Sequence, residues 1–239
     1  MLIGLIGLWQ LLSATIGAAL VPSPIDTLKA ASLLAQEPEL WQAMISTAAS
    51  LITGYAIAIL VGVPIGVIMG GVRSVGLLLN PYVDALSSMP RVAFLPLIII
   101  FLGLGFSAKV FMIFLGAVMP IIVNTQAGVL ASDGELIEMA RSAGAKEHTI
   151  FRTIMLPGAL PYIITGVRIG ATLALINAVV AELYTAVSGL GGLLSIYGNS
   201  FRMAPYFVIV LVLAMFGLAL THGLRLIETA LLRWRHAGR

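Results

Sequence analysis

Residues 138–157, EMARSAGAKEHTIFRTIMLP, form a compact polar segment that contains a histidine and a glycine and ends in Leu-Pro. The rest of the chain is strongly apolar: of 239 residues, 60% are hydrophobic and only 10% are charged. A soluble domain carries about 25% charged residues, so this composition indicates an integral membrane protein. We therefore expect the polar segment to lie outside the hydrocarbon core, between two groups of membrane spans.

The chain leading into this segment carries a helix-start signal. Ser132 followed by Glu135 fits a capping box, which predicts that a helix begins there. Leu136, Met139 and Ala143 then follow the spacing of one apolar helix face. The sequence predicts a short amphipathic helix at the start of the loop.

A turn and a second short helix are expected next. Glu138 is spaced to pair with Arg141 along the first helix, and Gly144 is suited to a left-handed stop at its end. The second helix is predicted to end at Leu156 and Pro157. Helices this short are unstable alone in water and need a surface on which to dock. The residues leave two surfaces open: lipid headgroups, or another protein.

Charge-free runs predict the membrane spans, because a helix needs about 20 apolar residues to cross the hydrocarbon. Six spans are expected, at residues 1–25, 40–72, 92–108, 110–132, about 161–187, and 203–224 with a possible extension toward 232. The third run covers only about 25 Å, so we expect its helix to include residues before Arg91. Gly62, Gly66 and Gly70 recur every fourth residue, which favours close packing of the second span against another helix.

The expected organisation is a single all-α transmembrane domain over residues 1–239. Residues 1–46 hold the first span and an external loop, 47–232 form the core with the polar loop at 132–157, and 233–239 form a tail. No basic residue precedes the first apolar run, so we expect that span to be retained and not to act as a cleaved signal.

The orientation follows from lysine and arginine in the loops, which favour the cytoplasm. With six spans, seven of these residues lie on the side of the termini and three on the other side. The seven are Arg73, Arg141, Lys146, Arg152, Arg233, Arg235 and Arg239; the three are Lys29, Lys109 and Arg202. Both termini and the polar loop are therefore expected in the cytoplasm. The small net charge of +3 reflects this loop bias and gives no reason to expect a nucleic-acid partner.

Three ionisable residues are expected within or near the hydrocarbon, where charge is costly and marks candidate sites of a transport pathway or gate. Arg168 is expected to reach the cytoplasmic headgroups or to pair with carbonyl groups. Arg91, near the cytoplasmic end of the third span, shares a helix face with Asp84 and can serve a structural role. Glu182 precedes the glycine-rich stretch SGLGGLL at residues 188–194, which suggests a turn or re-entrant segment and a gate at the outer mouth.

Several function classes lack their sequence signals. The chain has no cysteine, no G-x-x-x-x-G-K-[ST] phosphate loop and no close histidine pair of the H-E-x-x-H type. An enzyme, including an ATPase, is therefore not expected. A secondary transporter or channel acting alone usually shows intramembrane acids or inverted repeats, and here only Glu182 is well placed. This class remains the alternative to a permease driven by a separate ATPase.

The polar loop resembles the EAA loop of ABC-importer permeases. That motif reads E-A-A, three residues, Gly, nine residues, then Ile-x-Leu-Pro, and only Met139, at the first alanine, departs from it. The matching residues are Glu138, Ala140, Gly144, Ile154, Leu156 and Pro157. SSMPRVAFLPLIIIFLGLG (87–105), PIIVNTQAGV (120–129), LPGALPYIITGVRIG (156–170) and VVAELYTAVSGLGGLL (179–194) are also similar to the nitrate, sulfonate and taurine permeases. The resemblance covers roughly residues 50–232.

This resemblance implies a type I ABC-importer permease of a prokaryotic cytoplasmic membrane. Two permease copies would pair, two ATPase subunits would bind ATP below them, and a substrate-binding protein would dock outside. The six motif residues would couple the permease to the ATPase, and this chain would bind no cofactor itself. Nitrate, sulfonates, taurine, bicarbonate and vitamin precursors are all compatible solutes.

Overall fold

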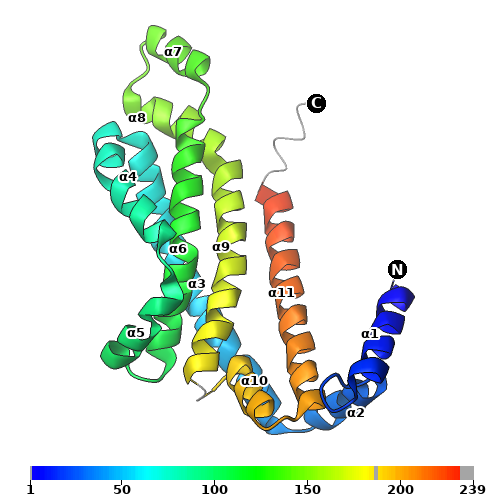
Figure 1. Cartoon of the computed structure of the whole chain (residues 1–239). Coiled ribbons are helices and arrows are strands. Elements are labelled where there is room, and N and C mark those ends of the chain that lie inside the picture. The colour runs from blue at the N-terminus through cyan, green and yellow to red at the C-terminus, as the bar shows by residue number, and fades with distance from the viewer. Residues whose placement is uncertain (1, 186–187, 232–239) are drawn as a thin grey trace.

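The computed structural model describes residues 2–185 and 188–231, and within these ranges the chain is helical without any strand. The predicted all-α class is confirmed (Figure 1). The elements are α1 (Leu2–Ile16), α2 (Pro24–Leu34), α3 (Pro38–Gly71), α4 (Arg73–Ser88), the 3₁₀ turn η1 (Arg91–Phe94), α5 (Leu95–Leu102), α6 (Phe106–Leu130), α7 (Gly134–Ser142), α8 (Glu147–Ile150), the π turn η2 (Phe151–Met155), α9 (Leu156–Thr185), α10 (Leu190–Asn199) and α11 (Met203–Leu231).

Four helical runs in the described residues are long and apolar enough to cross a membrane: α3, α6, the continuous run Glu147–Thr185, and α11. A fifth span can be formed by the bent pair α4 and η1–α5. The helix found at the expected first span is shorter than predicted. α1 has 15 residues and covers about 22 Å of the roughly 30 Å core. The expected tail at 233–239 and the end of the fifth span at 186–187 lie outside the described residues.

The third expected span is not one straight helix. α4 and the η1–α5 run meet at an angle of 86°. Pro90 lies at the break, and a residue before proline is driven to extended backbone, which Met89 adopts with ψ 137°. Arg91 and Asp84 therefore lie on separate helices, and the expectation that they share one helical face is wrong.

α6 is the central helix of the bundle and is packed between α3 and α9 (Figure 1). The predicted glycine stripe faces it: a Cβ added to Gly66 would lie 2.6 Å from the Ile122 carbonyl oxygen. The side of α6 toward α9 is also close, since a Cβ at Gly166 would lie 3.1 Å from the Pro120 carbonyl oxygen. Glycine on these helices lets backbones approach in lipid, as the stripe predicted.

The two ends of the bundle carry different structures. α7 projects beyond the helices at one end, and α2 and α10 lie across the other end (Figure 1). At the α10 end, Leu34, Leu190, Leu193 and Ile209 form part of a buried apolar cluster. Each end therefore presents a distinct surface, one built from a projecting loop and the other from helices packed against the spans.

Candidate functional site

The loop helix α7 is capped by Asp133. The Asp133 Oδ1 atom accepts hydrogen bonds from the backbone N–H groups of Glu135 (2.9 Å) and Leu136 (3.4 Å). The predicted capping box at Ser132 is wrong, because the Ser132 hydroxyl donates backward to the Val129 carbonyl at 2.8 Å. Asp133 is one residue closer to the helix than Ser132, and its negative charge is favourable at a helix N-terminus.

Gly144 ends this helix in the left-handed region, with φ of +80°, as predicted. The Gly144 N–H donates to the Arg141 carbonyl at 2.9 Å, and the Ala145 N–H donates to the Ala140 carbonyl at 3.0 Å. These bonds satisfy carbonyl groups that would otherwise be free at the helix end. The turn therefore depends on backbone geometry that only glycine adopts easily.

A bidentate ion pair connects α7 to α8. Arg141 Nε lies 2.9 Å from Glu147 Oε1, and Arg141 Nη2 lies 3.2 Å from Glu147 Oε2. The hydrogen bond from Arg141 lowers the pKa of the Glu147 carboxyl below its ordinary value. The predicted pairing of Glu138 with Arg141 is wrong: Glu138 is exposed and forms no hydrogen bond or ion pair with the residues described. The Glu138 carboxylate is free to meet another molecule.

The second loop helix does not end at Leu156 and Pro157. The chain stays helical from Glu147 to Thr185, passing through the π turn η2. That turn contains Thr153, whose carbonyl would meet the Pro157 ring in a regular α-helix. The wider π turn thus accommodates the proline without stopping the helix.

The loop leaves an apolar stripe of α7 uncovered. Leu136 is 44% exposed and Met139 is 64% exposed, while Ile150 in α8 is 1% exposed and anchors the loop to the bundle. Of the six residues that match the motif, Glu138 and Gly144 are exposed, and Ala140, Ile154, Leu156 and Pro157 are half-buried. The motif therefore has one part that holds the loop on the bundle and one part that points away from it.

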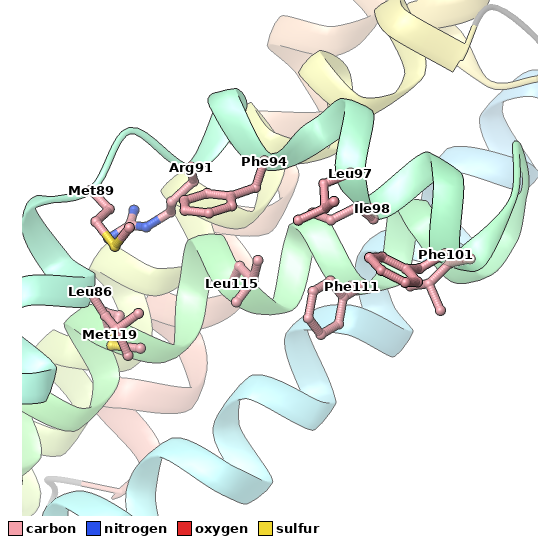
Figure 2. Close-up of a pocket in the computed structure, with 11 residues that line it drawn as sticks. Leu86, Met89, Arg91, Phe94, Leu97, Ile98, Phe101, Phe111, Leu115 and Met119 are labelled. Atoms are coloured by element: carbon pink, nitrogen blue, oxygen red, sulfur yellow. The ribbon is translucent and has the colours of Figure 1, made fainter.

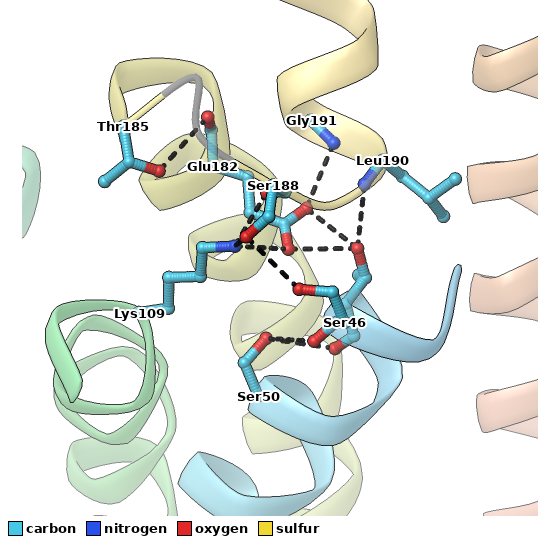
Figure 3. A network of polar contacts seen from close by, with 9 residues as sticks. Ser46, Ser50, Lys109, Glu182, Thr185, Ser188, Leu190 and Gly191 are labelled. Carbon is cyan, nitrogen blue, oxygen red and sulfur yellow. Dashed lines mark hydrogen bonds and ion pairs between the residues drawn. The ribbon is translucent and has the colours of Figure 1, made fainter. Parts of the chain in front are cut away.

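A second polar site lies at the opposite end, around the fully buried carboxylate of Glu182 (Figure 3). Thr47 donates its hydroxyl toward Glu182, with both carboxylate oxygens at 2.9 Å, and the Gly191 N–H donates at 3.0 Å. Lys109, only 2% exposed, places its Nζ 3.4 Å from Glu182 Oε1. The buried charge is thus paired and hydrogen-bonded, as burial in an apolar bundle requires.

The same network holds the turn before α10 (Figure 3). Lys109 Nζ donates to the Ser188 carbonyl at 2.6 Å and to its hydroxyl at 2.8 Å. Gly189 adopts φ of +97°, and an added Cβ there would overlap the Glu182 carboxylate. Glu182 therefore connects α3, α6 and α9 to the turn that begins α10.

Sequence reasoning found Glu182 but missed its partners. Lys109 was expected in an external loop between two spans, whereas it lies buried in α6. Two opposite charges, Lys109 and Glu182, each near the outer end of an apolar run, were the available signal for a pair. Spacing along the sequence cannot show that Thr47 and Ser188 also bind to this charged pair.

Arg168 pairs across helices. Arg168 Nη1 lies 3.1 Å from Glu228 Oε2, and this bond joins α9 to α11. The expectation of a structural pair agrees with this contact, although the partner is a carboxylate and not the expected carbonyl group. Arg168 is therefore placed between two spans and not beside Glu182.

Arg91 lies in η1 and lines one pocket together with Leu115 and Met119 from the middle of α6 (Figure 2). Its Nε atom is buried without a hydrogen-bond partner among the described residues. The structure thus separates the three ionisable candidates: Glu182 lies at the α10 end, Arg168 pairs with α11, and Arg91 lines a pocket with α6. No group of three or more His, Asp or Glu residues in the described ranges is placed to hold a metal ion.

Comparisons with known proteins agree with this architecture. Residues 62–233 match the family model described as binding-protein-dependent transport system inner membrane component. A probable ABC transporter permease of Brucella abortus is 34% identical over 96% of this chain and 92% of its own length. The putative aliphatic sulfonates transport permease SsuC of Escherichia coli is 34% identical over 98% of this chain and 90% of its own length.

The fold is similar to a solved structure, an inward-facing form of the MetNI methionine ABC transporter. The TM-score is 0.69 at 21% identity, covering 82% of this chain and 99% of the matched chain. The matched family model covers well over half of the sequence, and the relatives align along nearly its whole length. The chain therefore belongs to the family of inner membrane components of binding-protein-dependent transport systems, as the permease subunit of an ABC importer.

Proposed function

We propose that this permease receives the energy of ATP hydrolysis through α7, which docks on a separate ATPase subunit. Two copies of the chain pair around the solute pathway, and an external substrate-binding protein delivers solute at the α2 and α10 end. The observation that carries the proposal is the uncovered stripe of Leu136 and Met139 on a helix that projects from the bundle (Figure 1). An apolar helix face with no internal partner is suited to a groove on another protein.

The local bonds of the loop make α7 a firm attachment point. The Arg141–Glu147 pair bridges α7 to α8, and the buried Ile150 fixes α8 to the bundle. The helix that starts at Glu147 continues to Thr185, a length of roughly 58 Å. A displacement of the loop is thereby carried along α9 to the Glu182 network at the far end.

The proposed orientation places α7 in the cytoplasm. Arg141, Lys146 and Arg152 all lie in the loop at this end, and Arg73 lies at the start of α4 after α3. Positive residues in short loops favour the cytoplasmic side. The Glu182 network then lies near the outer surface, where a gate between pathway and binding protein is needed.

The ATPase contact is tested by co-expressing the full-length permease with its ATPase partner and purifying the permease. Met139→Asp places a charge on the exposed stripe and is expected to weaken ATPase co-purification by about tenfold or more, since burial of one methionine contributes about 1.5–3 kcal/mol. The matched control is Leu28→Asp, on a 73% exposed leucine of α2 at the opposite end, which should retain the ATPase. Undiminished co-purification of the Met139 variant would contradict the proposal.

A further inference from the structure

A pocket of about 540 Å³ opens between the last turns of α3 and the α8–η2 segment. Val67, Ile68 and Val72 form its wall on the α3 side, and Ile68 and Val72 are 49% and 47% exposed. A Cβ added to Gly71 would lie 2.9 Å from the Phe151 ring, so the glycine lets this ring pack against the end of α3. The two elements are therefore in contact at Phe151, while the apolar α3 wall of the pocket stays open.

The α8–η2 side of the pocket carries basic and polar side chains. His148 and Arg152 line it, and both are exposed. The Arg152 side chain forms no ion pair with the residues described. Glu147 also lines the pocket, but its carboxylate is bound by Arg141 in the bidentate pair. The pocket therefore presents the positive charge of Arg152 together with a carboxylate that is already neutralised.

The pocket crosses the expected edge of the hydrocarbon. Residues 54–72 of the chain have no polar side chain besides Tyr55 and cover roughly 27 Å, close to the thickness of the hydrocarbon core, and Arg73 follows directly. The edge therefore falls near Val72. On the other wall, Arg152 precedes Met155 by about one helical turn, and the chain runs from the loop into the bundle. The pocket thus has an apolar end inside the hydrocarbon and a cationic end at the headgroups.

This division matches an amphiphilic anion. The arginine guanidinium binds phosphate through two parallel N–H groups, and basic pockets between membrane helices bind acidic headgroups. The volume of about 540 Å³ lies in the range of small-molecule sites, so the pocket is more than a flat helix face. α7 projects beyond α8 and away from the bundle (Figure 1), so a protein that docks on α7 need not fill the pocket. Its chemistry therefore favours lipid.

We propose that this pocket binds an acidic phospholipid from the membrane leaflet at the α7 end. Arg152 binds the phosphate, and the first methylenes of an acyl chain pack on Ile68 and Met155. Such a lipid contacts both α3 and the start of the long helical run Glu147–Thr185, and it therefore stabilises the attachment of α8 to the bundle. The inference goes beyond the importer function, because the site requires neither the ATPase nor the solute.

The test uses the full-length chain in phosphatidylcholine nanodiscs with a trace of photoreactive phosphatidylglycerol, which carries a diazirine on its acyl chain close to the ester. After irradiation, mass spectrometry identifies the labelled residues. We expect the label to concentrate on residues 67–72 and 151–156. Unlabelled phosphatidylglycerol should displace it at least about fivefold more effectively than zwitterionic phosphatidylethanolamine, because a basic residue near the membrane surface favours acidic lipid.

Arg152→Gln should lower labelling of these residues at least about fivefold, because the charge that binds the phosphate is lost. The matched control is Lys146→Gln, which removes a positive charge from an exposed residue of the same loop outside the pocket and should label as the parent does. Arg152→Lys should lose less than Arg152→Gln, because it keeps the charge without the paired N–H groups. Equal labelling of Arg152→Gln and Lys146→Gln, or equal displacement by the two lipids, would overturn the proposal.

Further arms separate the other occupants. Soluble sn-glycerol 3-phosphate has the phosphate but no acyl chain, so it should not displace the label; displacement equal to that by phosphatidylglycerol would make the pocket a site for a soluble anion. Adding the ATPase partner should leave labelling intact, and its loss would assign the pocket to the ATPase. A parent chain without label at these residues would mean that a second copy covers the pocket or that acidic lipid does not bind there. Each of these results contradicts the inference.

Discussion

At the residue scale, the clearest physical constraint is the buried pair of Glu182 and Lys109. Their side chains are 0% and 2% exposed, and each also binds backbone groups at the turn before α10. Removing one member leaves the other charge buried and unpaired, whereas removing both leaves a neutral site. The pair therefore fixes the ends of α6 and α9 next to α10 in one arrangement.

We expect Glu182→Gln and Lys109→Met each to destabilise the protein by about 3–5 kcal/mol, and the double variant to lose less than the sum. Thermal unfolding in nanodiscs, analysed as a double-mutant cycle, measures this. Lys29→Met, at an exposed lysine of α2, is the control and should change stability little. Single variants as stable as the control would show that the pair does not hold these helices.

Gly144 tests the loop geometry. A side chain at φ of +80° costs about 1–2 kcal/mol for most residues, although asparagine tolerates this region better. We expect Gly144→Val to abolish ATP-dependent uptake, Gly144→Asn to reduce it less, and Gly134→Ala to leave it intact. An added Cβ meets nothing within 4 Å at Gly144 or at Gly134, and only Gly144 has positive φ, so the comparison isolates the backbone effect. A Gly144→Val variant that assembles and transports normally would refute this role.

At the element scale, α6 is held by backbone contacts on two sides. We expect Gly66→Ala to destabilise the bundle by about 1–3 kcal/mol, because its Cβ would lie 2.6 Å from the Ile122 carbonyl oxygen. Gly223→Ala in α11, where a Cβ meets nothing within 4 Å, should be neutral or stabilising. Equal unfolding temperatures for the two variants would show that the α3–α6 contact is looser than described.

The ion pair between Arg141 and Glu147 predicts that the α7–α8 connection loses stability in acid. The pKa of Glu147 is lowered by its bond to Arg141, so the pair stabilises the α7–α8 connection above the ordinary value of 4.5. This contribution is lost as the pH falls through the lowered value. Amide hydrogen exchange across residues 139–150, corrected for intrinsic rates, should therefore increase below pH 4.5. Glu147→Gln should exchange rapidly at all pH values, and a parent loop insensitive to acid would contradict this.

Elements with a simple local signal were predictable from the sequence. The charge-free runs located α3, α6, α9 and α11, and the Gly144 stop followed from the chemistry of helix ends. The break between α4 and η1 was missed because the run at 92–108 is short for a span, so its helix was expected to extend back through Arg91 and Pro90. Hydropathy does not show that the chain bends there. The continuity of the helix through Pro157 was missed because the π turn that admits the proline has no sequence signal of its own.

The candidate sites also differ in how far the sequence alone could predict them. The motif from Glu138 to Pro157 identified the loop, because its spacing is local in sequence. The contacts of Glu182 with Thr47 and of Arg168 with Glu228 join residues 135 and 60 positions apart, so only the packing of the helices reveals them. Arg91 was a candidate because a charge within the hydrocarbon is energetically costly. The pocket that it lines depends on the bend after α4, which the sequence did not show.

At the scale of the whole molecule, one continuous helix links the two ends. The run Glu147–Thr185 begins beside the projecting loop and carries the Glu182 carboxylate near its other end. α6 packs against it over most of its length, and α3 packs on the other side of α6 (Figure 1). Packed helices, and not flexible loops, thus connect α7 with the turn before α10.

Uptake of solute into proteoliposomes tests this account most directly. The permease is reconstituted with its ATPase and supplied with its solute-loaded substrate-binding protein, and uptake is measured with ATP, without ATP, and for the permease alone. Uptake is expected only when ATP, the ATPase and the binding protein are all present, and it should be lost with Gly144→Val. Uptake by the permease alone, without ATP, would contradict it.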